Sequence, residues 1–346
     1  FSKSQGVTSP INVEWDLENS GLLSLSQQDA SLQWQGALTD NGGQYIVEQG
    51  FLDLAPPSSQ DPYIFTPDSR LLAGPGARIN LGSGAGVGSE TLYELQGSIE
   101  MSGIFSIKNF NGSTTASVTI PATANLVNLG QELLLVGSSR GRLLVEVTDP
   151  VSVGDLTVGS IGRLELSSPL TVSGDYTQNN SSAVMVSDFD ITVEGGLAWS
   201  GGRMEGAGTT FLNGGAVITG GPGSASSNKT LNQRRLVIPT GQSMEISGNR
   251  LTGSNGAILD IREGGLLDIT AGNNSRVMEV GDGGATILNA GTISKSQGTT
   301  FQIDVYWSLE NLGTLEITQD EAELKFYDQF SNTGTISILS ETAILE

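Results

Sequence analysis

Apolar and polar residues alternate over short stretches along most of the chain. Residues 302–305 and 321–326 are two clear examples. Alternation with a period of two is typical of a β-strand that buries one face. Gly, Asn, Asp and Ser interrupt these stretches every few residues, and these residue types favour tight turns. Since no stretch of ten or more residues has helical periodicity, the pattern predicts an all-β protein.

The two ends of the chain carry the same sequence pattern. Residues 1–25 and 293–317 are identical at 14 of 25 positions without a gap. The identical positions include a tryptophan and a glycine in each copy: Trp15 and Gly21 in the first, Trp307 and Gly313 in the second. Extended to the last residue, 1–54 matches 293–346. Positions 1–292 therefore read as one full period, and 293–346 begin the next, as in a tandem array.

A shorter period lies within the long one. Asn289, Asn311 and Asn332 each begin the motif N-x-G-T-[IL], and the motif glycines are spaced by 22 and 21 residues. Units of ~20–29 residues that carry several short strands are typical of solenoids, in which stacked turns share one interior. The sequence therefore predicts a parallel β-helix (β-solenoid) with roughly 16 coils of about 21 residues. A stack of immunoglobulin-like sandwiches fits less well, because such domains need longer strands and ~100 residues each.

Composition changes along the chain suggest four regions. Residues 1–54 and 293–346 are the two copies of the terminal coils, and 91–292 form the main solenoid. Residues 55–90 are rich in Pro and Gly, with five of the 11 prolines between positions 56 and 75. Proline cannot donate to a strand ladder, so we expect 55–90 to be an excursion from the stack. We expect the rest to form one continuous solenoid.

Composition also excludes several classes of function. The chain has no His and no Cys, which excludes Ser-His-Asp and Cys-His catalysis, imidazole and thiolate metal sites, and disulfides. With 16 Lys+Arg against 37 Asp+Glu, the net charge of −21 argues against nucleic acid and anionic membranes as partners. No apolar run approaches the ~18–20 residues of a membrane helix. We therefore expect a non-enzymatic protein that does not insert into a membrane through this segment.

Several segments resemble large bacterial solenoid proteins. Residues 155–178 resemble the coils of autotransporter-type and other large secreted proteins. Residues 196–210 and 229–247 resemble a recurrent module of giant bacterial surface proteins, and 332–338 are similar to their N-T-G-T-[VI] coils. The resemblance implies a right-handed parallel β-helix outside the bacterial cell or on its surface, with a role in adhesion, surface coating or matrix. It implies no catalytic residue.

Pairs of carboxylates are the first candidates for a site. Asp188 with Asp190 and Asp260 with Glu263 are close in sequence, and calcium prefers carboxylate oxygens. Paired carboxylates also serve glycoside hydrolysis. In so acidic a chain such pairs arise by chance, so a solvated acidic face is the plainer interpretation. Calcium is the one cofactor for which the sequence leaves room.

Aromatic and basic residues are the second group of candidates. Trp307 alternates with Ile303 and Val305, so we expect it and its equivalent Trp15 in the core. Three tyrosines are then the better exposed candidates for stacking on a sugar ring: Tyr306, Tyr327 and Tyr45. β-Helix lyases use Arg or Lys beside calcium, and the chain has two basic pairs: Arg140 with Arg142, and Arg234 with Arg235. We expect these arginines to balance charge at the surface.

Two functions follow from these observations. The first is a structural or adhesive repeat module of a large extracellular or cell-surface bacterial protein, forming a rod or filament. Such a module would associate with itself, head to tail or side by side, and display loops to a cell-surface glycan. The alternative is a glycan-active β-helix enzyme, namely a polysaccharide lyase, a hydrolase or a tailspike-like depolymerase. The start at Phe1, without Met, is typical of a mature piece or an excised fragment.

Overall fold

The described part of the chain consists of β-strands and turns. The computed structural model describes residues 2–3, 10–57, 61–82, 90–108, 115–136, 141–220, 228–248, 250–271, 276–297 and 302–346. Every regular element in these ranges is a strand, which confirms the all-β prediction. The chain divides into two compact units, Phe1–Ser173 and Gly174–Glu346.

The first unit contains strands β1 to β22. They are β1 (Ser2–Lys3), β2 (Ile11–Val13), β3 (Leu17–Asn19), β4 (Leu22–Leu25), β5 (Ser31–Trp34), β6 (Leu38–Asp40), β7 (Gln44–Val47), β8 (Phe51–Leu54), β9 (Tyr63–Phe65), β10 (Arg70–Ala73), β11 (Arg78–Leu81), β12 (Glu90–Leu95), β13 (Ser98–Met101), β14 (Ile104–Ile107), β15 (Thr115–Ile120), β16 (Asn125–Leu129), β17 (Glu132–Leu135), β18 (Gly141–Val145), β19 (Val151–Val153), β20 (Asp155–Val158), β21 (Arg163–Leu166) and β22 (Leu170–Val172).

The second unit contains strands β23 to β43. They are β23 (Tyr176–Ser187), β24 (Ile191–Val193), β25 (Leu197–Glu205), β26 (Thr209–Leu212), β27 (Ala216–Ile218), β28 (Lys229–Asn232), β29 (Arg235–Ile238), β30 (Ser243–Ile246), β31 (Leu251–Ser254), β32 (Ala257–Ile261), β33 (Leu266–Ile269), β34 (Arg276–Val280), β35 (Ala285–Asn289), β36 (Thr292–Lys295), β37 (Ile303–Val305), β38 (Ser308–Asn311), β39 (Thr314–Ile317), β40 (Glu323–Phe326), β41 (Phe330–Asn332), β42 (Thr335–Ile338) and β43 (Ile344–Leu345).

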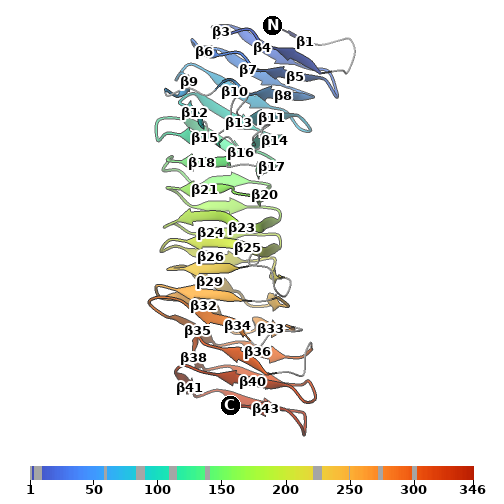
Figure 1. The fold of residues 1–346 in the computed structure, drawn as a ribbon, viewed down its shortest axis with the longest axis vertical. Coiled ribbons are helices and arrows are strands. Elements are labelled where there is room, and N and C mark those ends of the chain that lie inside the picture. Colours follow the sequence, from blue (N-terminus) through green and yellow to red (C-terminus); the bar gives the residue numbers. More distant parts are fainter. Residues whose placement is uncertain are drawn as a thin grey trace. The chain divides into compact units, whose positions relative to one another are not determined.

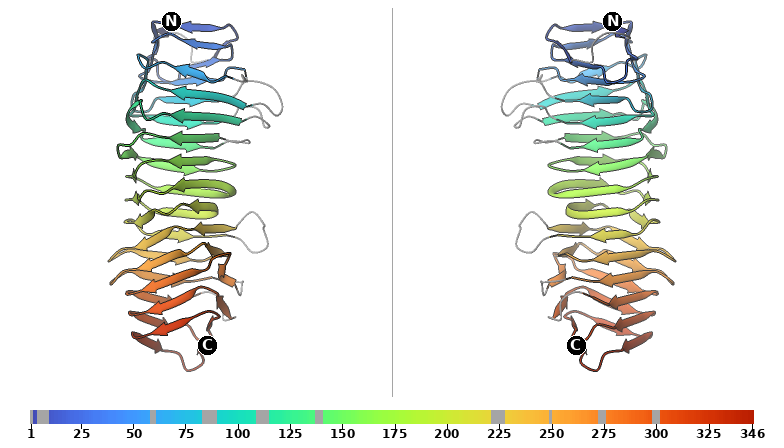
Figure 2. Two further views of the ribbon diagram at one scale, coloured as in Figure 1. Left: turned by 90° about the vertical axis from the view of Figure 1, so that its left-hand side faces the viewer. Right: turned by 90° about the vertical axis from the view of Figure 1, so that its right-hand side faces the viewer.

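Each unit is a parallel β-solenoid. Strands pair in parallel with strands one turn earlier and one turn later, so that β7 lies between β4 and β10 in the first unit, and β39 between β36 and β42 in the second. Figures 1 and 2 show this stacking of successive turns within each unit. A parallel pair needs a connection longer than a tight hairpin, and here the rest of the turn supplies it.

Alternating side chains fill the interior of each unit. In β15, Ala116, Val118 and Ile120 are buried and the residues between them are half-buried. The same alternation recurs in most strands, so each turn adds apolar side chains to one continuous core. Burial of apolar area contributes about 25 cal/mol per Å², which makes this core the main stabilising term.

The turns are fewer and longer than the sequence predicted. The two units together contain about 13 turns rather than 16. Turn length varies along the chain: Val151 lies opposite Leu170 across a short turn, and Tyr63 lies opposite Tyr93 across a long one. The expected turn length came from the C-terminal motifs alone, and most other turns carry longer corners.

Strands β9, β10 and β11 of the proline-rich region belong to the stack, contrary to the excursion expected at 55–90; residues 58–60 lie outside the described residues. Strands β10 and β11 lie within this range and pair in register with the turns before and after. The prolines lie outside the strands; Pro75, for example, occupies the turn between β10 and β11. Proline is compatible with a solenoid at a corner, where no ladder N–H is needed. Residues 83–89 lie outside the described residues.

The N-x-G-T motifs form a ladder that joins three turns of the second unit. The Nδ2 amide of Asn289 donates to Oδ1 of Asn311 over 2.6 Å, and Nδ2 of Asn311 donates to Oδ1 of Asn332 over 2.6 Å. The motif glycine allows the turns to approach closely, because a Cβ on Gly313 would collide with the carbonyl oxygen of Gly291. The motif thus encodes contact between turns rather than a ligand site.

The two terminal copies have the same strand pattern. All seven strands from β2 to β8 have counterparts, β37 to β43, that begin within one position of the offset relating Phe1 to Ile293. Asp29 and Glu321, at equivalent corners, both have a positive φ, 59° and 57°. The repeat therefore specifies backbone geometry in detail.

The described residues contain no helix long and apolar enough to cross a membrane.

Candidate functional site

Tyr306 and Tyr327 form a stacked pair on the exterior of the second unit. Each follows directly after a strand, β37 and β40, and these strands pair with Val305 opposite Phe326. The rings are 4.6 Å apart and nearly parallel, at 10°. Tyr327 is 47% exposed and Tyr306 is half-buried. The structure therefore brings together two of the three tyrosines that the sequence singled out.

Two cations flank this tyrosine pair. The Arg276 guanidinium lies 5.7 Å from the ring centre of Tyr306, and the Lys325 ammonium lies 5.5 Å from that of Tyr327. A hydrogen bond from Lys325 to Glu346 raises the pKa of the lysine, and one from Arg276 to Glu279 raises the pKa of the arginine, so both remain charged. Cation–π contacts at exposed sites contribute about 0.5–1 kcal/mol.

The stacking limits what the tyrosine pair can bind. The backbone N–H of Tyr306 bonds to the preceding turn, and that of Tyr327 bonds to the turn of Tyr306, so Tyr306 lies between the turns of Arg276 and Tyr327. Its ring has neighbours on both sides, whereas Tyr327 offers the open area. Gln302 donates an amide hydrogen to the Tyr327 hydroxyl over 2.9 Å. The surface available to a sugar is thus the Tyr327 ring with polar groups around it.

Tyr45 is buried, which corrects the expectation that it is exposed. Its ring packs 5.0 Å from that of Phe65, and its hydroxyl donates to Oδ1 of Asp40 over 3.0 Å. Burial raises the pKa of Tyr45. The register explains the error, because Tyr45 pairs with Leu23 of the preceding turn and faces the same interior. A ligand outside the solenoid cannot contact this side chain.

Asp188 and Asp190 connect turns rather than converge on one point. Both are exposed, and their Oδ1 atoms accept hydrogen bonds from the backbone N–H groups of Ala207, at 2.9 Å, and Thr209, at 3.0 Å. Each carboxylate therefore caps a different amide of the following turn.

Asp260 and Glu263 are also used separately. Asp260 is 6% exposed at its side chain and accepts ion pairs from Arg235 and from Arg262, the latter at 2.9 Å. Glu263 is exposed, and its backbone carbonyl accepts a hydrogen bond from Thr240. In the described ranges no group of three or more acidic side chains is placed to hold a metal ion.

The adjacent arginines Arg234 and Arg235 have different environments. Arg235 forms the ion pair with Asp260, as expected for charge balance. Arg234 is fully buried, contrary to the expected surface position, and donates to the carbonyl oxygens of Ser187, Phe189 and Thr209. Burial lowers its pKa to about 10. Its role is to join three turns.

The other basic pair is only partly described. Arg142 is half-exposed at its side chain and lies 3.7 Å from Glu165. Arg140 lies outside the described residues. The arrangement of a lyase, with Arg or Lys beside a calcium site, does not occur among the described side chains.

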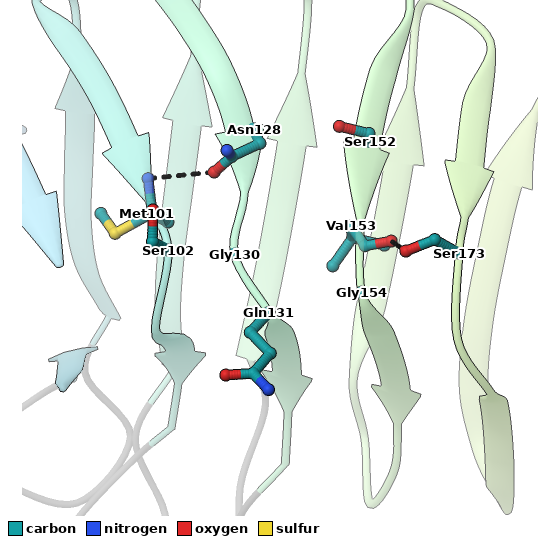
Figure 3. Close-up of a pocket in the computed structure, with 9 residues that line it drawn as sticks. All are labelled: Met101, Ser102, Asn128, Gly130, Gln131, Ser152, Val153, Gly154 and Ser173. Atoms are coloured by element: carbon teal, nitrogen blue, oxygen red, sulfur yellow. Dashed lines mark hydrogen bonds between the residues drawn. The ribbon is translucent and has the colours of Figure 1, made fainter. Parts of the chain in front are cut away.

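The first unit carries a groove that the sequence did not indicate. Figure 3 shows it at the ends of strands β13, β16 and β19, and its volume is about 350 Å³. It is lined by small, amide and apolar residues: Met101, Ser102, Asn128, Gly130, Gln131, Ser152, Val153, Gly154 and Ser173. The described residues of the lining include neither a carboxylate nor an aromatic ring. Such a surface can hydrogen-bond hydroxyl groups but offers no acid or base.

A break in the strand ladder produces this groove. The register between β13 and β16 shifts after Ile99, so that Val127 is an extra residue and Asn128 lies opposite Glu100. The Asn128 side chain then accepts the N–H of Met101 over 3.0 Å. Strand β16 ends its sheet, and β19 belongs to another sheet. No sequence motif marks this change, because it depends on the lengths of consecutive turns.

The structure thus places three different surfaces on this solenoid fold. They are the tyrosine pair, the separated carboxylates and the polar groove. Of these three surfaces, only the tyrosine pair combines aromatic and charged groups among its described residues. No known protein family, curated protein or solved structure matches the chain.

Proposed function

We propose that this chain is a non-catalytic structural and adhesive module of a large extracellular or surface-exposed bacterial protein. The observation that carries the proposal is the internal repeat, in which the seven strands β2 to β8 recur as β37 to β43. Stacked turns extend without limit when each turn presents the same edge to the next, so a repeated solenoid is suited to building length.

Exposed apolar residues at the two ends support association between copies. Trp15 in the first turn is 81% exposed, and Ile338 in the last turn is 43% exposed. Their counterparts Trp307 and Ile317, each covered by a neighbouring turn, are at most 1% exposed. Unpaired strand edges with apolar residues favour pairing with another chain. The module would therefore associate with copies of itself, head to tail or side by side.

The tyrosine pair supports the adhesive part of the proposal. The second copy has Tyr306 and Tyr327 where the first copy has Glu14 and Gln35. Stacking between turns does not require these tyrosines, because the first copy forms the same strands without them. A surface that differs while the core is retained is suited to a ligand, here a cell-surface glycan.

A glycan-active enzyme is the second candidate function. The polar groove favours it, because its hydroxyl and amide groups suit a polysaccharide strand. Against it, the described lining of this groove contains neither a carboxylate nor an arginine.

Two assays distinguish these functions. In the first, the chain is incubated with acidic and neutral polysaccharides, and reducing ends and unsaturated products are measured. In the second, binding to a glycan array is compared between the parent chain and the Tyr327→Ala variant. We expect no product, and array binding that the substitution weakens. Released products would contradict the structural role, and an unchanged array signal would remove Tyr327 from the adhesive surface.

A further inference from the structure

The two equivalent tryptophans have opposite environments. Trp307 is fully buried, and its indole N–H donates to the carbonyl oxygen of Glu279 in the preceding turn over 2.7 Å. Its ring packs over Gly253, where a Cβ would collide with the indole. Trp15 is 81% exposed. A large apolar ring in that position lacks the contacts that its counterpart makes.

The equivalent glycines repeat this difference. At Gly313 a Cβ would collide with the carbonyl oxygen of Gly291, whereas at Gly21 a Cβ would meet nothing within 4 Å. Neither glycine has the positive φ that would itself favour glycine. The close approach of a preceding turn is therefore the physical reason for Gly313. Gly21 keeps the residue type although nothing in the first unit requires it.

Part of the covering turn is already present in the first unit. Strand β1 pairs with β4, with Ser2 opposite Ser24. The pairing of β36 with β39 is equivalent, with Ser294 opposite Glu316. The turn directly before Trp307 consists of β34, β35 and β36. Among its described residues, the first unit contains a counterpart of β36 only, which is β1.

We infer that the N-terminal face of residues 10–25 is a docking surface for a second copy of the repeat. The docked part runs from β31 to β35 of that copy and continues into β1, and it covers Trp15 as β31 to β36 cover Trp307. Glycine at position 253 of that copy receives the indole, and the carbonyl of its Glu279 accepts the indole N–H. The inference rests on the proposed function and specifies the junction, in which Thr292 of one copy precedes Phe1 of the next.

The first test places a copy of residues 240–292 in front of Phe1 of the full chain. Trp15 is the exposed tryptophan of four, since Trp34, Trp199 and Trp307 are at most 8% exposed. We expect acrylamide to quench Trp15 in the parent chain and in a chain with a scrambled extension, but not in the extended chain. Trp15→Phe identifies the quenchable emission. Equal quenching in the extended and scrambled chains would overturn the inference.

The second test uses the equivalent glycines. Gly21→Ala has room in the parent chain, so we expect an unchanged melting temperature there. In the extended chain the same substitution should lower the melting temperature and restore quenching of Trp15, whereas Gly313→Ala should destabilise both chains. A neutral Gly21→Ala in the extended chain would overturn the inference. If that result accompanied self-association of the parent chain, the proposed function would stand and only this junction would fail.

Discussion

The first and second copies of the repeat share their strands but not their surroundings. Seven strands begin at equivalent positions, and even the unusual φ values of Asp29 and Glu321 agree. Burial differs at both ends: Trp15 is exposed where Trp307 is buried, and Val47 is buried where Ile338, at the end of the equivalent strand, is 43% exposed. The local sequence therefore determines the backbone path of each turn, whereas the presence of neighbouring turns determines which side chains are buried.

The exteriors of the two copies have diverged in chemistry. Tyr327 and Lys325 occupy positions held by Gln35 and Gln33 in the first copy. These substitutions change the groups offered to solvent and leave the strands in place. At each position where the two copies differ, a substitution in one copy can be compared with the equivalent substitution in the other.

The largest contrast is expected between Trp307→Ala and Trp15→Ala. Removing a buried tryptophan costs about 3–5 kcal/mol, because the lost burial adds to the cavity left behind. An exposed side chain away from special features usually changes stability by less than about 0.5 kcal/mol. Urea unfolding followed by circular dichroism measures both. Similar losses in the two variants would contradict the difference in coverage.

Lys295, a buried lysine near the start of the second copy, should make the free energy of unfolding depend on pH. Lys295 is fully buried, and burial lowers its pKa from 10.5 to about 8. Below pH 8 the folded and unfolded states are both charged, and the folded state bears the full cost of burying the ammonium. Between about pH 8 and about pH 10.5 the folded state releases its proton first, so stability rises with pH in this window.

The expected rise is about 1–3 kcal/mol, and its measurement is the urea midpoint at about pH 7.5 and about pH 9.5. Lys229, also buried with a pKa lowered to about 8, contributes in the same direction. Lys295→Met should reduce the rise, and the control Lys325→Met should leave it unchanged, because the pKa of the half-buried Lys325 is raised and this lysine stays charged across the window. An equal rise in parent and Lys295→Met chains would remove Lys295 as its source.

The asparagine ladder provides a smaller contrast. Asn311→Ala removes the side-chain partner of Asn289 and of Asn332, and Asn289 keeps only its bond to the Thr314 carbonyl. Leaving a buried N–H without its partner costs about 1–3 kcal/mol. Asn332→Ala, at the exposed end of the same ladder, should cost less because water replaces the lost partner. Thermal unfolding of the two variants shows which substitution lowers the stability more. The reverse order would show that the ladder does not stabilise the second copy.

The smallest expected effect concerns the exterior. Tyr327→Ala loses one ring contact and one cation–π contact, together about 1–2.5 kcal/mol, and Gln35→Ala in the first copy should change nothing measurable. Differential scanning calorimetry can compare them. A large loss for Tyr327→Ala would make the pair a stabilising feature rather than a surface for a ligand.

Much of the fold could be predicted from the sequence, because its signals are local. The alternation identified strands, and the N-x-G-T motifs identified turns in contact. The exposure of Trp15 could not be predicted from its strand, because coverage depends on a turn that precedes it in space. The turn count was wrong because turns such as that from Leu71 to Ile99 are longer than those near the C-terminus.

The candidate site was predictable only in part. Tyr306 could be identified as exposed because it lies between the inward positions Val305 and Trp307, but its stacking on Tyr327 depends on the pairing of β37 with β40. The burial of Tyr45 depends on its register with Leu23, and that of Arg234 depends on three carbonyl groups distant in sequence. The groove of Figure 3 depends on an extra residue in β16. These features depend on tertiary contacts, which cannot be predicted from residue type alone.

Sedimentation velocity over a range of concentrations is the most direct test of end-to-end association between copies of the chain. At about 0.15 M salt the net charge is screened beyond about 8 Å, so contacts between ends are not suppressed by repulsion at long range. The account predicts that the mean mass rises with concentration. We also expect Trp15→Asp and Ile338→Asp to return it to the monomer, and Tyr327→Ala to leave it unchanged. A parent chain that stays monomeric at every concentration would contradict the account.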